Sequence, residues 1–171
     1  IEAHFHSDFD LGVAPTVAAM RAGAQVAHVT VNGIGERAGS APLGAVALSL
    51  EALYGQHTGI KLEMLKELSD LVVERSNFPV WPIKAVDGDR LFGWETGLPS
   101  SLWVNSKDTN PLIMLPYHYS LTGHEEPVLF LGKKSGKDNL KYWLDKAGIE
   151  LSEEDQKELL QMVKTRSIEL K

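Results

Sequence analysis

The sequence contains no cysteine, no long apolar run and no excess of basic residues. The absence of cysteine excludes disulfide bonds, thiolate catalysis and cysteine-ligated zinc, and it is typical of a reducing cytoplasm. No stretch reaches the roughly 18 apolar residues that a membrane-spanning helix needs. A net charge of −6 over 171 residues gives the chain no overall attraction to nucleic acid or anionic lipid. We therefore expect a cytoplasmic protein that binds neither nucleic acid nor membrane.

The composition is that of an ordinary globular domain, alone or with a small appendage, because 43% of the residues are hydrophobic and 23% are charged. The chain begins at Ile1 rather than at a methionine. Its first residues already have the pattern of a buried strand that carries functional groups. We expect the chain to be a C-terminal portion of a longer protein, or one subunit of a split one.

The first part of the chain alternates between strand and helix patterns. Strands are predicted at residues 1–6 and 25–31, the second of them rich in β-branched residues. Small apolar residues predict helices at 11–22 and 42–54. The order strand, helix, strand, helix is typical of an α/β unit with a parallel sheet, and this unit is too short to close a barrel by itself.

The rest of the chain is predicted to be largely helical. Apolar spacing and end signals predict three helices, at 62–75, at 137–147 and from Ser152 to about 168. Gly148 would end the second of these, and Ser152 would cap the third. Residues 77–127 show little periodicity and are predicted to be irregular, and residues 128–132 are predicted to form a short strand.

Two histidines and an amide indicate a metal site. His4 and His6 are two positions apart on a predicted strand, so both imidazoles point to one face. Such a pair is more often structural than metal-binding, but Asn32 follows the next predicted strand in a glycine-rich turn. The carboxyl ends of neighbouring parallel strands meet at one edge of a sheet. We therefore expect a site for Mg²⁺, Mn²⁺ or Zn²⁺, with Asp8 as a further ligand or, preferably, as a partner that orients a histidine.

Other polar residues leave alternatives open. Glu36 and Arg37 either form an ion pair that only holds the turn or lie on the rim of the site. His28 faces either the core or the site. Residues 133–137 resemble part of a phosphate loop but lack its leading glycine and its spacing. We interpret them as a solvated basic turn before a helix, with contact to a phosphorylated ligand at the helix N-terminus as the lesser alternative. Three histidines are in predicted loops and are expected to be solvated: His57, His118 and His124.

Three segments resemble motifs of the acyl-CoA-dependent condensing enzymes, a group of the DRE-TIM metallolyases. Residues 4–14 (HFHSDFDLGVA) resemble the pattern HxHNDxGLxVA, and residues 30–40 (TVNGIGERAGS) resemble TxNGxGERAGN. Residues 132–137 (GKKSGK) are similar to the GKxSGK that precedes the family's helical subdomain. The family includes isopropylmalate, homocitrate, citramalate and Re-type citrate synthases, with hydroxymethylglutaryl-CoA lyase as a relative.

The resemblance covers nearly the whole chain and implies a C-terminal portion of such an enzyme. Residues 1–56 would be the last two βα units of a TIM barrel. Residues 57–127 would be a helical and irregular linker subdomain, and 128–171 a small helical subdomain. By the resemblance, an α-rich linker and a small α+β communication subdomain follow the barrel and reach across a homodimer. The family's first barrel strand, with an aspartate ligand beside a catalytic arginine and glutamate, has no counterpart in these residues. The missing barrel portion or a partner subunit would supply it.

The resemblance also implies residue roles and a reaction. Three residues would hold the divalent metal: His4, His6 and Asn32. Thr30 and Asn32 would bind substrate. Glu36 and Arg37 would be catalytic. The reaction would be a Claisen condensation of acetyl-CoA with a 2-oxo acid, in which the metal polarises the ketone and a base removes a proton from the acyl methyl group.

Several positions depart from the family pattern. Three lie near the predicted site, where asparagine, asparagine and glycine are replaced: Ser7, Ser40 and Asp10. Residues 92–99 (FGWETGLP) resemble FTHESGIH, with Trp94 and Pro99 in place of its two histidines. Without these histidines, either the base is supplied elsewhere, or the chain belongs to a subgroup such as the Re-citrate synthases with another arrangement, or the activity has changed. Two other functions compete with the synthase: a carbon–carbon lyase or aldolase of the same fold, and a non-catalytic regulatory or assembly subunit. The reverse-direction lyases carry a cysteine-bearing loop, so the absence of cysteine favours a synthase.

Overall fold

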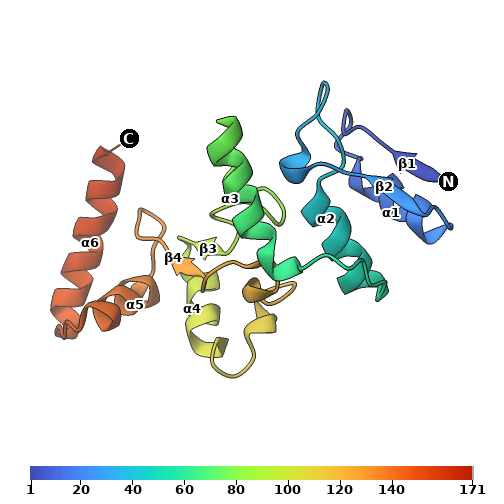
Figure 1. Cartoon of the computed structure of the whole chain (residues 1–171). Coiled ribbons are helices and arrows are strands. Elements are labelled where there is room, and N and C mark those ends of the chain that lie inside the picture. Colours follow the sequence, from blue (N-terminus) through green and yellow to red (C-terminus); the bar gives the residue numbers. More distant parts are fainter. Residues whose placement is uncertain (171) are drawn as a thin grey trace. The chain divides into compact units, whose positions relative to one another are not determined.

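The computed structural model describes residues 1–170, which form two compact units. Unit 1 comprises Ile1–Leu91 and Ser120–His124, and unit 2 comprises Phe92–Tyr119 and the residues from Glu125 onward. Figure 1 follows the chain through its elements. No helix within the described residues is long and apolar enough to cross a membrane.

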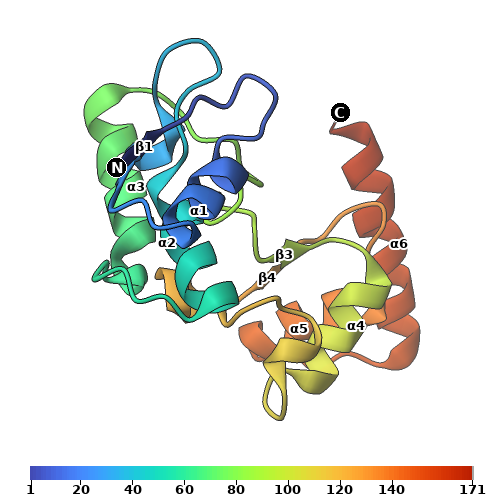
Figure 2. The same ribbon diagram turned by 90° about the vertical axis from the view of Figure 1, so that its right-hand side faces the viewer.

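Unit 1 opens with two parallel strands and the helix that connects them. These elements are β1 (Glu2–His4), α1 (Val13–Arg21) and β2 (Val26–His28). Residue 4 pairs with residue 28 in the register, and Figure 2 shows α1 next to the strands. The predicted parallel α/β arrangement is confirmed. The strands are shorter than predicted, because after His4 and His28 the backbone turns into the loops that carry the candidate site.

The second helix of unit 1 changes its type along its length. Helix α2 (Leu43–Leu48) continues directly into a π-helical turn, η2 (Ser49–Leu53). The helix predicted at 42–54 is therefore continuous but not uniformly α-helical. Four residues from α1, α2 and the segments beside them form the buried core of this part: Val17, Ala41, Val46 and Leu50.

Helix α3 lies against the loop that follows β2. It spans Leu65–Ser76 and is preceded by a 3₁₀ turn, η3 (Leu62–Met64), as predicted for residues 62–75. Leu65 and Ser69 are its buried residues, and the helix contacts the short 3₁₀ turn η1 (Val31–Gly33). Through this contact, a helix from the expected linker region becomes part of the surroundings of Asn32.

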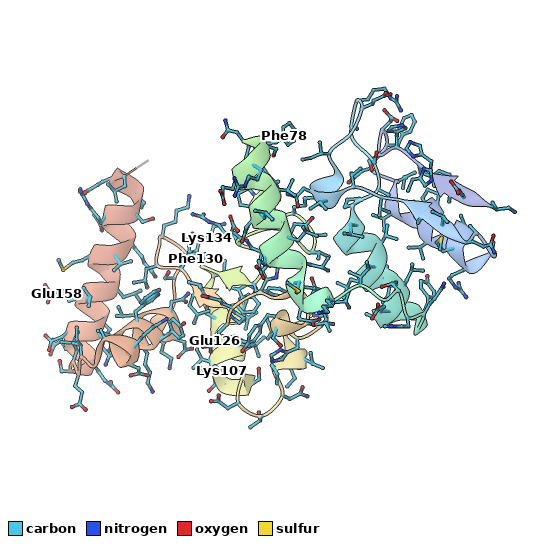
Figure 3. The ribbon with its side chains drawn as sticks, in the orientation of Figure 1. Phe78, Lys107, Glu126, Phe130, Lys134 and Glu158 are labelled. Atoms are coloured by element: carbon cyan, nitrogen blue, oxygen red, sulfur yellow. The ribbon has the colours of Figure 1, made fainter. Side chains whose placement is uncertain are left out.

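Unit 2 is a second, mostly helical assembly. Its elements are β3 (Gly93–Trp94), α4 (Gly97–Ser106), the 3₁₀ turn η4 (Pro111–Ile113), β4 (Val128–Leu129), α5 (Lys137–Ala147) and α6 (Glu153–Glu169). A 3₁₀ turn, η5 (Tyr119–Thr122), includes residues of both units. Strands β3 and β4 pair in parallel. Figure 3 shows Lys107 and Glu126 of this unit, whose Nζ and Oε1 atoms form an ion pair at 2.8 Å.

Helix α4 corrects the prediction that residues 77–127 are irregular. Its buried positions are Ser100, Trp103 and Ser106, spaced by three residues along the helix. Two of these three are serines, so the inward face has no apolar stripe and the segment has the polarity of a loop. The helices predicted at 137–147 and 152–168 are confirmed. Gly148 ends α5 with a φ of +66°, and Ser152 Oγ accepts a hydrogen bond from the Asp155 backbone N–H at 3.1 Å.

Candidate metal centre

His4 and His6 bring two imidazole nitrogens together. The Nε2 atoms of the two residues lie 3.2 Å apart, and the rings meet edge to face with centroids 4.9 Å apart. Both imidazoles therefore share one face, as the strand alternation predicts. Two nitrogens bound to one cation at about 2.1 Å, with a ligand angle of roughly 90–110°, would be separated by about 3.0–3.4 Å. The observed separation matches that of neighbouring ligands on a single metal ion.

The backbone sets the tautomer of His6. Its Nδ1 lies 3.3 Å from the carbonyl oxygen of Gly39, which also accepts a hydrogen bond from Ser7 N at 2.9 Å. Because a carbonyl only accepts, Nδ1 carries the proton of the neutral ring, and Nε2 keeps a free lone pair. Metal-binding histidines are commonly oriented in this way through their second nitrogen.

The loop that supplies the Gly39 carbonyl folds back on itself. Ser40 N donates to Gly33 O at 3.1 Å, and Gly39 has a φ of +89°. A Cβ atom at Gly39 would lie 2.0 Å from Gly33 O, so only glycine fits this position. The glycines of the motif thus place one carbonyl against His6.

Asn32 has an amide oxygen that fits a cation. Its backbone is left-handed, with a φ of +58°, and its Nδ2 donates to the carbonyl oxygen of Ser69 on α3 at 3.1 Å. Its Oδ1 is buried without a hydrogen-bond partner, and so is Thr30 Oγ1 in the same loop. A buried amide oxygen left without a partner is uncommon, and it is a suitable ligand for a hard divalent cation.

The protein offers only part of a coordination sphere here. Within residues 1–170, no three histidine, aspartate or glutamate side chains form a group that could hold a metal ion. The ring of His28 lies 5.5 Å from that of His4, but His28 Nε2 is paired with Glu2 Oε2 at 2.8 Å. The two imidazole nitrogens of His4 and His6 fit a divalent ion that takes its remaining ligands from elsewhere.

Asp8 and Arg37 close the loops beside the histidines. Arg37 donates from Nε to Asp8 Oδ1 at 2.7 Å and from Nη2 to Asp8 Oδ2 at 3.0 Å. Its contact with Glu36 Oε2 is longer, at 3.4 Å. The hydrogen bond from Arg37 holds the pKa of Asp8 below its ordinary value. The Asp8 carboxylate thus binds Arg37 rather than the histidine that we expect as its partner. The ion pair of Arg37 with Glu36 inside the turn is the longer of the two contacts.

Three of the five positions that depart from the resembled motifs have a local structural role. Asp10, in place of a glycine, has a φ of +59° and so keeps the left-handed backbone that glycine favours. In unit 2, the ring of Trp94 packs on that of Trp103 with centroids 5.8 Å apart. Pro99 lies in the first turn of α4, where a missing N–H is tolerated.

The prediction that His124 is solvated is wrong. It is half-buried in unit 1, with Nδ1 3.0 Å from the Thr122 hydroxyl and Nε2 3.3 Å from Gly88 O. Burial lowers its pKa. His118 is also half-buried, whereas His57 is exposed as expected. Loop position alone therefore does not decide whether a histidine is solvated.

The basic turn before α5 has a structural role. Glu95 Oε1 accepts a hydrogen bond from Lys134 N at 3.0 Å, and Ser135 Oγ accepts one from Gly132 N at 2.9 Å.

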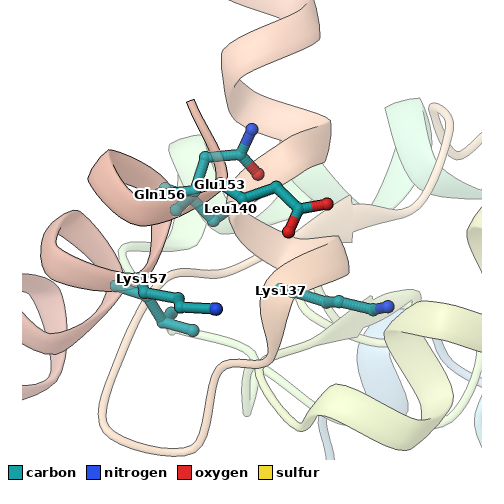
Figure 4. A pocket seen from close by; sticks show the side chains of 6 residues that line it. Lys137, Leu140, Glu153, Gln156 and Lys157 are labelled. Atoms are coloured by element: carbon teal, nitrogen blue, oxygen red, sulfur yellow. The ribbon is translucent and has the colours of Figure 1, made fainter. Parts of the chain in front are cut away.

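A nearby pocket of about 260 Å³ opens between α5 and α6 (Figure 4). Its charged lining residues are Lys137, Glu153 and Lys157. Charges of both signs give this pocket no preference for an anionic ligand.

The chain is similar in sequence to several known proteins. The HMGL-like family model matches residues 1–72, which include both histidines and the Asn32 loop. The chain is 40% identical over 164 residues to the (R)-citramalate synthase of Methanocaldococcus jannaschii, covering 96% of this chain and 32% of that protein. It is 38% identical to the 2-isopropylmalate synthase of Sulfolobus acidocaldarius, covering 96% of this chain and 42% of that protein. The chain therefore spans about a third to two fifths of the length of these curated relatives.

Proposed function

We propose that this chain is part of a metal-dependent synthase that condenses acetyl-CoA with a 2-oxo acid. The observation that carries the proposal is the 3.2 Å separation of His4 Nε2 and His6 Nε2, with the His6 tautomer set by Gly39. Homology to citramalate and 2-isopropylmalate synthases supports the reaction class. Residues 1–56 would be the end of a TIM barrel, and the remaining ligands would come from the rest of that barrel or from a partner subunit.

Each candidate site residue would have its own role in the reaction. His4, His6 and Asn32 would hold a Mg²⁺, Mn²⁺ or Zn²⁺ ion. Such an ion, when bound, polarises the carbonyl and carboxylate of the 2-oxo acid. The Thr30 hydroxyl, buried and without a partner, would donate to a substrate oxygen. Glu36 and Arg37 would form the catalytic rim, with Asp8 keeping the guanidinium in one orientation.

The family histidine that Pro99 replaces is absent, so the base is expected in another part of the enzyme. We further propose a cytoplasmic homodimer, in which the segments 57–127 and 128–171 act as linker and communication subdomains. The synthase is preferred over a lyase because the chain contains no cysteine.

A second function, that of a non-catalytic assembly subunit, is favoured by one observation. Glu95, in the segment that resembles FTHESGIH, uses its carboxylate to bind Lys134 N, and its neighbour Trp94 packs on Trp103. Both side chains therefore serve the fold of unit 2. This candidate keeps the fold but needs no metal.

Thiol release separates the two candidates. The chain is co-expressed with, or extended by, the barrel portion that it lacks, and CoA release is followed with acetyl-CoA, Mg²⁺ or Mn²⁺ and one of four acids: oxaloacetate, 2-oxoglutarate, 2-oxoisovalerate or pyruvate. We expect metal-dependent release with one acid, lost in His4→Ala and His6→Ala. Bound metal without release from any acid would favour the lyase, and failure to bind metal would favour the assembly subunit.

A further inference from the structure

The pocket between α5 and α6 combines apolar and charged lining residues. Two leucines, one from each helix, are its less exposed side chains: Leu140 is only 4% exposed, and Leu160 is half-buried. The other lining residues are polar or charged: Lys137, Glu153, Gln156 and Lys157. The volume of about 260 Å³ equals roughly nine water molecules at about 30 Å³ each. The pocket therefore suits a small metabolite rather than a nucleotide.

Hydrogen-bond acceptors gather on one side of this pocket. Figure 4 shows the Glu153 carboxylate and the Gln156 amide on the same side. The Gln156 Nε2 atom donates to Leu151 O at 2.9 Å, so the amide is held in place and its Oε1 remains as an acceptor. An ionised carboxylate also only accepts hydrogen bonds. A charged and a neutral acceptor on one side favour a ligand that carries an ammonium group.

The two lysines of the pocket lie on the opposite side in Figure 4. Glu153 and Lys157 are four positions apart on α6, a spacing at which opposite charges commonly pair. Lys66 and Asp70 form such a pair on α3. No ion pair is recorded within residues 1–170 for Lys137, Glu153 or Lys157. Charges of both signs therefore line one pocket without neutralising each other.

We propose that the pocket between α5 and α6 binds a zwitterionic α-amino acid with an apolar side chain. The ammonium group would bind the Glu153 carboxylate and Gln156 Oε1, the carboxylate would bind the two lysines, and the side chain would pack on the two leucines. A ligand with only one charge would leave one side of the pocket unused. The proposal also assigns a role to Lys137, the last residue of the GKKSGK segment, which the proposed reaction does not use.

The test is a titration of the full chain with L-leucine, followed by proton–nitrogen NMR spectra. The dissociation constant comes from the chemical shifts of the Leu140 and Lys157 amides. Two analogues keep the leucine side chain but lack one charge each: 4-methylpentanoic acid has no ammonium group, and 3-methylbutylamine has no carboxylate. Glycine keeps both charges but has no side chain. Because the pocket lies within unit 2, the result depends on neither metal nor acetyl-CoA.

We expect L-leucine to shift both amides and each singly charged analogue to bind at least about 10-fold more weakly, because charge-assisted hydrogen bonds are lost. Glycine should also bind more weakly, since it buries no apolar surface. Glu153→Gln and Lys157→Met should each weaken leucine binding about 10- to 100-fold. The matched controls Glu158→Gln and Lys164→Met change the same charges on α6 outside the pocket and should leave the affinity unchanged.

Three results would overturn the inference. The first is the absence of leucine-dependent shifts at Leu140 and Lys157. The second is equal affinity for 4-methylpentanoic acid and leucine, which would make the pocket a site for anions. The third is an equal loss of leucine affinity in Glu153→Gln and Glu158→Gln, which would assign the effect to net charge. The substituted residues in this comparison are exposed, so neither variant removes a buried contact of unit 2.

Discussion

Arg37 and Asp8, 29 positions apart, form a two-pronged ion pair that ties the loop after β2 to the loop after β1. The same two loops are joined a second time where Gly39 O meets His6 and Ser7. The histidine pair is therefore held through the Asn32 loop as well as through its own strand.

Removing the ion pair should loosen this loop. In Arg37→Gln, we expect faster deuterium exchange at the amides of Ser7 and Gly39, because the guanidinium no longer joins the two loops. Arg166→Gln is the control, since Arg166 pairs with Glu169 on its own helix. Equal exchange in Arg37→Gln and the unsubstituted chain would show that the backbone hydrogen bonds hold the loop without the ion pair.

Each histidine of the pair should be necessary for metal binding. His4→Ala or His6→Ala should weaken Mn²⁺ binding by about 100-fold or more, since each removes a direct ligand, whereas loss of a supporting partner costs about 10- to 100-fold. His28→Ala and His57→Ala are the controls. His28 lies beside His4 but is paired with Glu2, so its loss should leave the affinity unchanged in a calorimetric titration. A comparable loss in His28→Ala would place the metal elsewhere.

Gly39→Ala should disturb the histidine pair through a steric clash with the backbone of the same loop. Its Cβ atom would lie 2.0 Å from Gly33 O, and the Gly39 carbonyl would have to move away from His6. Gly23→Ala is a matched control, because Gly23 has a φ of +104° but no atom within 4 Å of the added Cβ. The control should cost about 1–2 kcal/mol in unfolding free energy and spare Mn²⁺ binding. Gly39→Ala should cost more and weaken Mn²⁺ binding, as measured by urea unfolding and metal titration.

Asn139 should be a main determinant of the stability of unit 2. It is fully buried, and its Nδ2 lies within hydrogen-bonding distance of three acceptors: Glu95 O, Ser100 Oγ and Phe130 O. Asn139→Ala removes the Asn139 partner of Glu95 O and of Gly136 N, while Ser100 Oγ keeps its bond to Thr96 O and Phe130 O its bond from Ser135 Oγ. This loss should lower the unfolding free energy by roughly 2–4 kcal/mol. Asn105→Ala, at an exposed position on α4, should cost less than about 0.5 kcal/mol. Urea unfolding followed by tryptophan fluorescence measures both.

His124 should make the protein less stable in mild acid. Burial lowers its pKa in the folded state, so below the unfolded pKa of about 6.5 the unfolded chain binds a proton that the folded chain does not. The stabilisation is therefore complete above that pH and is lost as the pH falls toward the folded pKa. In His124→Gln, this part of the acid-side decline should disappear from urea unfolding measured between pH 7 and pH 5. His57→Gln is the control and should keep the decline in stability. If His124→Gln also keeps it, the decline comes from other groups.

The sequence predicts features that depend on neighbouring residues better than contacts between residues far apart in the chain. The bounds of α5 and the cap at Ser152 follow from side chains within one helical turn, and the shared face of His4 and His6 follows from strand alternation. The hydrogen bond from Lys84 Nζ to the main-chain oxygen of Asn32 spans 52 positions and depends on a buried turn with an unusual backbone at Val86. The sequence does not predict helix α4, because its inward serines give no apolar period.

The division of the chain into two interleaved units limits how the protein can be cut into fragments. Neither unit is one continuous stretch, since Ser120–His124 belongs with Ile1–Leu91 although 28 residues of unit 2 precede it. A truncation after Leu91 would remove His124, which covers the carbonyl oxygen of Gly88. A fragment starting at Phe92 would carry that short segment without the residues it packs against. No single cut yields both units intact, and modular exchange with a related protein would have to graft two separate stretches at once.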